Sequence, residues 1–147
     1  MKLIILISSL LLLNTLITKA QAATCSAALP PAAVQILNPS LTTLLQGNTV
    51  CVGTIDNWQA QEYHKAPSGT IDNLIDYHQG SNISDPTSPI GSWSISIPDN
   101  TVSYTYHEGS NYTDTLYNNG DGTYTFCDQF SNTATKAIAI KIGQVAC

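Results

Sequence analysis

Apolar and polar residues alternate with a period of two from Thr49 onward, in short runs that turn residues separate. Such alternation is typical of strands with one buried face. We predict one strand for each of the runs TVCVGTI, WQAQEYH, TIDNLIDYH, SWSISI, VSYTYH, YTDTLY, TYTFC and KAIAIKI. Proline, glycine and asparagine stand between most of these runs, where chain reversals favour them. The pattern therefore predicts a chain of hairpins.

The predicted fold class is all-β, with a single antiparallel meander of about eight strands over residues 49–147. A meander hides its edge strands best when it closes, so we expect a small closed or nearly closed barrel, with a β-sandwich as the alternative. A barrel of this size is filled by side chains or holds one small ligand. Residues 23–48 have a loose helical spacing that Pro39 interrupts, which predicts a short N-terminal helical segment.

Residues 1–22 have the features of a cleavable signal peptide: Lys2, an apolar run, and the small-x-small motif Ala20-Gln21-Ala22. We therefore expect export to the periplasm or the extracellular space. The apolar run is short for a membrane span, and no later stretch is apolar enough to cross a bilayer. A lipid anchor on Cys25 is disfavoured, because Thr24 stands where such sites carry glycine, alanine or serine.

The charge of the chain after residue 22 is strongly negative. It has three lysines, no arginine and ten carboxylates. No cationic surface is available to neutralise phosphates, which excludes nucleic acid as a partner and disfavours anionic lipid head groups. The balance favours a neutral or cationic partner, and we expect a monomer.

All four cysteines, Cys25, Cys51, Cys127 and Cys147, follow the predicted signal peptide. An even number in an oxidising compartment predicts two disulfides, whereas zinc sites require closely spaced pairs that this chain lacks. Three pairings are open. Cys25–Cys51 with Cys127–Cys147 is slightly favoured, because it would fasten each end of the chain to the barrel.

Alternate positions of the predicted strands carry the bulky side chains, which assigns these positions to the buried face. The assigned residues are Trp93, Ile95, Ile97, Val102, Tyr104, Tyr106, Tyr124, Phe126, Ile138, Ile140 and Ile142. The interior is thus expected to be aromatic on one side and aliphatic on the other. Tyrosines in such an interior either fill a core with their hydroxyls near the barrel ends or line a pocket. The sequence leaves both open.

His64 shares its parity with Trp58 and Glu62, which places Glu62 and His64 at the mouth of the predicted barrel. We interpret the two as a polar rim or a hydrogen-bonded pair. A carboxylate beside an imidazole also suits a general base or part of a metal site, although two ligands do not make a metal site.

The remaining polar motifs are interpreted as surface features. His78 and His107 alternate with inward tyrosines and are expected to point outward. Asp72 and Asp76 are four residues apart, and we expect them on one solvated strand face. NNGDG at residues 118–122 is predicted to be a hairpin turn, because its register does not fit a calcium loop. No catalytic motif, metal site or cofactor is predicted.

Several segments look familiar as a set: GNTVCV, WQAQEYH, LIDYHQG, DPTSPIGSWSI and VSYTYHEGSNY. Together they resemble a group of uncharacterised small exported proteins of Gram-negative bacteria, and they cover about residues 47–127. This resemblance implies export but no catalytic residues. In architecture the meander is similar to lipocalin-like (calycin) barrels, although the usual Gly-x-Trp near the first strand is missing here.

Three classes of function follow from these features, in this order. The first is an exported binding module for a small apolar or aromatic ligand, with the candidate binding residues Trp58, Glu62, His64, Trp93, Tyr104, Tyr106 and Tyr124. The second is a protein-interaction protein, such as an inhibitor of a cationic partner enzyme, which would use the negative surface. The third is an enzyme, which would rest on Glu62 and His64 alone.

The intact mass of the exported protein tests the processing and the thiols. We expect loss of residues 1–22 and no cysteine that reacts with an alkylating reagent before reduction. A lipid adduct on Cys25, or two alkylatable cysteines, would contradict the prediction.

Overall fold

The structure is a computed structural model that describes residues 24–55, 57–77 and 87–147. The signal peptide prediction and His78 lie outside the described residues. Within them the chain forms two short helices, α1 (Cys25–Ala28) and α2 (Ser40–Leu45). The strands are β1 (Val34–Gln35), β2 (Asn48–Thr54), β3 (Asn57–His64), β4 (Leu74–Asp76), β5 (Ser88–Ser96), β6 (Thr101–Tyr106), β7 (Asn111–Asn118), β8 (Tyr124–Asp128) and β9 (Ala134–Ile142).

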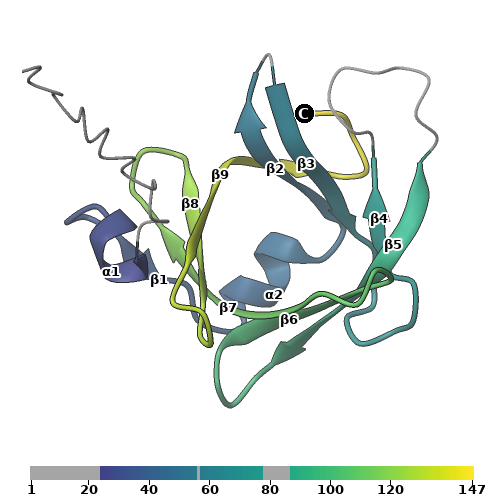
Figure 1. The fold of residues 1–147 in the computed structure, drawn as a ribbon, viewed down its shortest axis with the longest axis horizontal. Helices are drawn as coiled ribbons and strands as arrows, with labels where there is room; N and C mark the ends of the chain where they lie inside the picture. Colours follow the sequence, from purple (N-terminus) through teal and green to yellow (C-terminus); the bar gives the residue numbers. More distant parts are fainter. Residues whose placement is uncertain (1–23, 56, 78–86) are drawn as a thin grey trace, which may run out of the picture.

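Strands β2 to β9 form a closed antiparallel barrel in which each strand pairs with the next. The pairing of β9 with β2 completes the ring, which Figure 1 shows along the shortest axis of the chain. These strands correspond in order to the runs identified in the sequence, so the prediction of an all-β closed meander is confirmed and the sandwich is excluded.

The predicted third strand is shorter than its run of residues. Asp72 has a positive φ of 55°, which interrupts the extended chain just before β4. The side chain of Asn73 then takes over the pairing with β5. Its amide nitrogen donates to the Trp93 carbonyl at 3.1 Å, and its amide oxygen accepts from the Trp93 backbone N–H at 2.8 Å. A side chain thus replaces part of the backbone ladder between β4 and β5.

The segment before the barrel contributes more than the predicted helical turns. Strand β1 pairs with the end of β7, through Val34↔Asn118 and Gln35↔Tyr117. Helix α2 buries Leu41 and Leu45 completely in the hydrophobic core, and in Figure 1 it lies within the outline of the ring. Helix α2 therefore closes the end of the barrel at which β2 begins.

Two irregularities affect β2. Gly53 has a φ of +119°, and a Cβ there would lie 2.5 Å from the carbonyl oxygen of Asn57, so only glycine fits this β-bulge. The register with β9 also shifts between Cys51 and Val52. Because of this shift Ala137, and not Ile138, lies in the buried core together with Val50. The assignment of Ile138 to the buried face was therefore wrong.

The parity prediction is confirmed for the central aromatic residues and is wrong at two strand ends. Trp93, Tyr104 and Phe126 are 1%, 6% and 5% exposed. Ile97 lies beyond the end of β5 and Ile142 at the end of β9, where they are 70% and 89% exposed. Period-two parity holds along a strand but does not show where the barrel wall ends.

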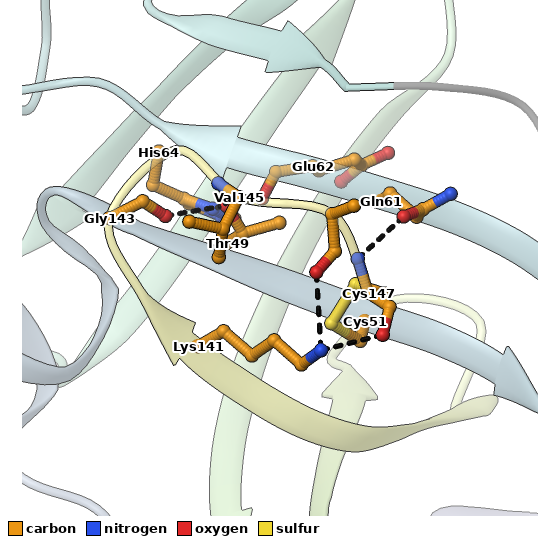
Figure 2. The surroundings of a disulfide bond; sticks show 10 residues. Thr49, Cys51, Gln61, Glu62, His64, Lys141, Gly143, Val145 and Cys147 are labelled. Atoms are coloured by element: carbon orange, nitrogen blue, oxygen red, sulfur yellow. Dashed lines mark hydrogen bonds between the residues drawn. A yellow bond between two sulfur atoms is a disulfide. The ribbon is translucent and has the colours of Figure 1, made fainter. Parts of the chain in front are cut away.

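The disulfides join Cys25 to Cys127 and Cys51 to Cys147, so the favoured pairing was wrong. Cys25 lies beside β8, where its N–H donates to the Asn132 carbonyl at 3.0 Å. Cys51 points out of the barrel, and the chain after β9 crosses this outer face, as Figure 2 shows. Sequence separations of 102 and 96 residues predict that each bond stabilises the fold by about 4–5 kcal/mol on the chain-entropy account.

The segment after β9 is held by polar contacts as well as by its disulfide. Thr49 donates from its hydroxyl to the Gly143 carbonyl at 2.7 Å, and the Cys147 N–H donates to the Gln61 side-chain oxygen at 2.7 Å. Thr49 and Gln61 are buried on the outer face for this reason. Among the described residues, no helix is long and apolar enough to span a membrane.

Paired substitutions on β5 test the inner and outer faces of the barrel. Trp93→Ala should lower the free energy of unfolding by about 3–5 kcal/mol, because it opens a cavity in the core. Ser94→Ala, one residue along on the outer face, should change it by about 0.5 kcal/mol or less. Urea denaturation measures both. Equal losses would show that the inner face is misassigned.

Candidate functional site

The barrel interior is packed in the half next to α2. The residues that fill this half include Leu41, Leu45, Leu74, Trp93, Val102 and Leu116, all between 0% and 1% exposed. The strand ends farther from α2 enclose a different environment. There the inward residues are smaller or polar, and a space remains between them.

This space is a cavity of about 170 Å³. Val50, Val52 and Ala60 form an aliphatic wall on β2 and β3. Facing them are aromatic side chains of β6, β7 and β8, namely Tyr104, Tyr106, Tyr112 and Phe126. An engineered apolar cavity of about 150 Å³ binds benzene, so the space suits a molecule of about one ring. The interior is therefore partly core and partly cavity, which were the two alternatives that the sequence left open.

His64 lies in the packed half, beneath the cavity floor that Tyr104 forms. Its Nε2 is 2.9 Å from the Tyr104 hydroxyl, and its Nδ1 is 3.1 Å from the Glu62 backbone carbonyl. A carbonyl only accepts, so Nδ1 carries the proton and the Tyr104 hydroxyl donates to Nε2. Burial lowers the pKa of His64 to about 4, which keeps the ring neutral. The rings of Trp93 and Tyr104 pack against the His64 ring, with centroid distances of 5.1 and 5.6 Å.

The side chains of Glu62 and His64 do not form the predicted rim pair. His64 is fully buried, and its ring bonds to the backbone oxygen of Glu62 and not to the Glu62 carboxylate. The Glu62 carboxylate instead accepts a hydrogen bond from the Tyr106 hydroxyl, at 3.0 and 3.1 Å to its two oxygens. The prediction was wrong because two residues of one parity point to one face but lie at different depths along a strand.

Glu62 lines the cavity and is affected by the loss of water there. Burial raises the pKa of Glu62 to about 7. The Tyr106 hydrogen bond opposes this shift, and the negative charges of Asp76, Glu108 and Asp114 add to it. Glu62 therefore loses its proton near neutral pH and not near its usual pKa of 4.5.

Asp114 and Asp128 lie opposite each other on β7 and β8, and both line the cavity. Burial, and then the charge of Asp128, raise the pKa of Asp114 to about 7. Burial also acts on Asp128, but hydrogen bonds from the Ser131 hydroxyl and from backbone N–H groups outweigh it and lower the pKa. Asp128 is thus the more acidic of the two carboxyl groups, and Asp114 keeps its proton to a higher pH.

Of the predicted binding residues, Glu62, Tyr104 and Tyr106 line the cavity. Trp93 and His64 support its floor from the packed half, and Tyr124 packs against the core near α2. Trp58 lies at the β2–β3 bulge, opposite Gly53, outside the lining of the cavity.

The sequence analysis missed Tyr112, Asp114 and Asp128. A signal for the first two exists, since Tyr112, Asp114 and Leu116 share one parity in the run YTDTLY. An aspartate is normally assigned to the solvent side of a strand, which hides this signal.

The other polar predictions have mixed outcomes. His107 is exposed as expected, and its Nε2 lies 2.7 Å from an oxygen of the Asp72 carboxylate. Asp72 precedes β4 whereas Asp76 lies within it, so the two do not share a strand face. Residues 118–122 form the predicted turn, with Gly120 and Gly122 at positive φ. No cluster of three metal-ligating side chains occurs in the described residues.

No family model, curated protein or solved structure matches the chain. The resemblance to small exported proteins therefore stays a prediction, and the cavity itself must carry any argument about function.

The raised pKa values predict a stability that depends on pH. The protonated forms of Glu62 and Asp114 are favoured by folding, so their contribution is fully present below about pH 4 and is lost as pH rises through about 7. Each group changes the free energy of unfolding by about 1.4 kcal/mol per pH unit within that window. Glu62→Gln removes one of them, so its stability relative to the wild type should rise by about 2 kcal/mol between pH 5 and pH 8.

Urea denaturation at both pH values measures this change, and Asp99→Asn on the exposed β5–β6 turn is the control. Parallel pH profiles for wild type and Glu62→Gln would show that Glu62 titrates normally.

Proposed function

We propose that the protein is a small exported binding module that takes an apolar or aromatic molecule of about one ring into the hollow half of its barrel. The observation that carries the proposal is the cavity of about 170 Å³ between the aliphatic wall of β2–β3 and the aromatic wall of β6–β8. A rigid closed barrel suits such a site because the strands hold the walls in place without a ligand.

The uneven packing of the barrel interior supports a binding site and argues against a core that is merely packed imperfectly. The half of the interior next to α2 is densely filled, with large side chains such as Trp93 and Leu116 fully enclosed. The opposite half carries tyrosines and carboxylates around open space. Pockets that bind small molecules have this composition, mainly apolar walls with a few placed polar groups.

The proposal also states where the protein acts, which is outside the cytoplasm. Two disulfides fit an oxidising location. The signal peptide expected at residues 1–22 would deliver the protein to the periplasm or the extracellular space.

Binding of toluene tests the proposal, because toluene is neutral and has one ring. We expect saturable chemical-shift changes at the methyl groups of Val50 and Val52, with the protein folded throughout. Ala60→Phe places a ring in the cavity and should weaken toluene binding at least tenfold. Gln59→Phe adds the same ring on the exposed outer face of β3 and should leave binding unchanged.

Absence of saturable binding to the wild-type protein would refute the proposed function. Equal weakening by Ala60→Phe and Gln59→Phe would place the binding site outside the barrel.

A further inference from the structure

The charged groups around the cavity are all of one sign. Glu62, Asp114 and Asp128 line it, and no lysine or histidine is among the lining residues. The lysines of the described chain lie elsewhere. Lys136 is 4.0 Å from Asp121 in the β7–β8 turn, Lys141 donates to the Cys147 carbonyl at 2.6 Å, and Lys65 follows β3 at the end closed by α2. The protein thus provides carboxylates to this cavity without a balancing cation.

Among the three carboxylates of the cavity, Asp114 has the fewest polar contacts with the protein. Its side chain is 8% exposed and faces the cavity from β7. Among the described residues, none donates a hydrogen bond to its carboxylate, whereas Asp128 and Glu62 both accept hydrogen bonds. Because Asp114 is largely removed from water, its ionisation is costly, and a cation that enters the cavity would lower that cost.

The aromatic wall provides a second, independent feature. The centroid of the Tyr106 ring lies 6.2 Å from that of Tyr104, in a stacked arrangement. It lies 5.9 Å from the ring centroid of Tyr112, in an edge arrangement. Phe126 continues this wall, 6.4 Å from Tyr104. Aromatic rings attract organic cations through the negative potential of their faces, most strongly where water is excluded. The cavity therefore combines carboxylates with several rings, as amine-binding sites do.

We propose that the ligand is a small organic cation, an ammonium group carried on an apolar body of about one ring, with the ammonium between Glu62 and Asp114 and the apolar body against the β2–β3 wall. This inference rests on the proposed binding function and specifies its ligand class. Anionic molecules do not fit it, since the lining charges are negative.

A dependence on pH follows from the groups that surround the two carboxylates. Glu62 faces Asp76, Glu108 and Asp114 together with the Tyr106 hydroxyl, and Asp114 faces Asp128. Burial raises the pKa of both carboxyl groups above their usual values. A cation binds their ionised forms, so its affinity should rise with pH up to about 7 and then level off, with protons released on binding below that pH.

The test compares two probes of the same shape that differ in charge: benzyltrimethylammonium is a cation and neopentylbenzene is neutral. Benzyltrimethylammonium is a permanent cation, so any pH dependence comes from the protein. At pH 8 we expect it to bind at least tenfold more tightly than neopentylbenzene, and at pH 5.5 we expect this preference to fall to threefold or less. Nuclear magnetic resonance titration measures both probes, and calorimetry in two buffers measures the released protons.

Substitution of the carboxylates locates the cation. Asp114→Asn should weaken benzyltrimethylammonium binding about tenfold at pH 8 and leave neopentylbenzene binding within twofold. Asp99→Asn makes the same change of charge on the exposed β5–β6 turn at the opposite end of the barrel, and should leave both affinities unchanged. If Asp114→Asn does not fold, Glu62→Gln serves the same purpose with the same expected loss.

The outcomes separate the two proposals. Equal affinity of the two probes at pH 8 would refute the cation while the binding function stands. Binding of benzenesulfonate as tight as that of benzyltrimethylammonium would refute it as well. Failure of both neutral and cationic probes to bind would refute the proposed function and the inference together.

Discussion

The antiparallel ladder between β2 and β9 is the contact on which the rest of the molecule depends. It joins the first and last strands of the meander, from Asn48↔Ile142 to Val52↔Ala137, and so turns a sheet with two free edges into a ring. Without this ladder the inner face would be an open surface, and the carboxylates on it would be solvated. Closure by β2–β9 is therefore what gives Glu62 and Asp114 their unusual surroundings, although neither residue lies in this ladder.

The two ends of the barrel treat buried polar groups differently. Next to α2, His64 is enclosed with both ring nitrogens bonded, to Tyr104 and to a backbone carbonyl. At the far end, Asp114 faces space without a donor among the described residues. A chain selected only for a stable core would gain from filling this space, because apolar side chains there would bury more area and would not carry a desolvated carboxylate. The cost of desolvating carboxylates at the far end is the physical reason for our proposal that this end binds a ligand.

Local pattern was enough to predict the strands and the closed meander, because alternation and turn residues act over a few neighbours. The features that were missed depend on contacts between distant segments. The shift in register between β2 and β9 at Cys51 and Val52 turns Ala137 inward, and nothing in the sequence KAIAIKI predicts it. The side chain of Asn73 replaces backbone pairing only because Trp93 lies across from it. Parity correctly predicted that Tyr104, Tyr106 and Glu62 point into the barrel and line the cavity. It could not show that His64, on the same face, lies deeper in the barrel and outside the cavity.

The disulfide arrangement has a consequence for the order of events during biogenesis. In sequence the two bonds overlap, with Cys51 inside the loop closed by Cys25 and Cys127 and Cys147 outside it. Under the export that we propose, a chain that crosses a membrane from its N-terminus would present Cys25 and Cys51 to oxidants well before the other two cysteines arrive. The bond that forms first under those conditions is absent from the folded barrel, and correcting it by thiol–disulfide exchange takes seconds to hours without catalysis. Under that proposal, efficient maturation calls for a disulfide isomerase, because an oxidant alone would leave part of the protein with Cys25 bonded to Cys51.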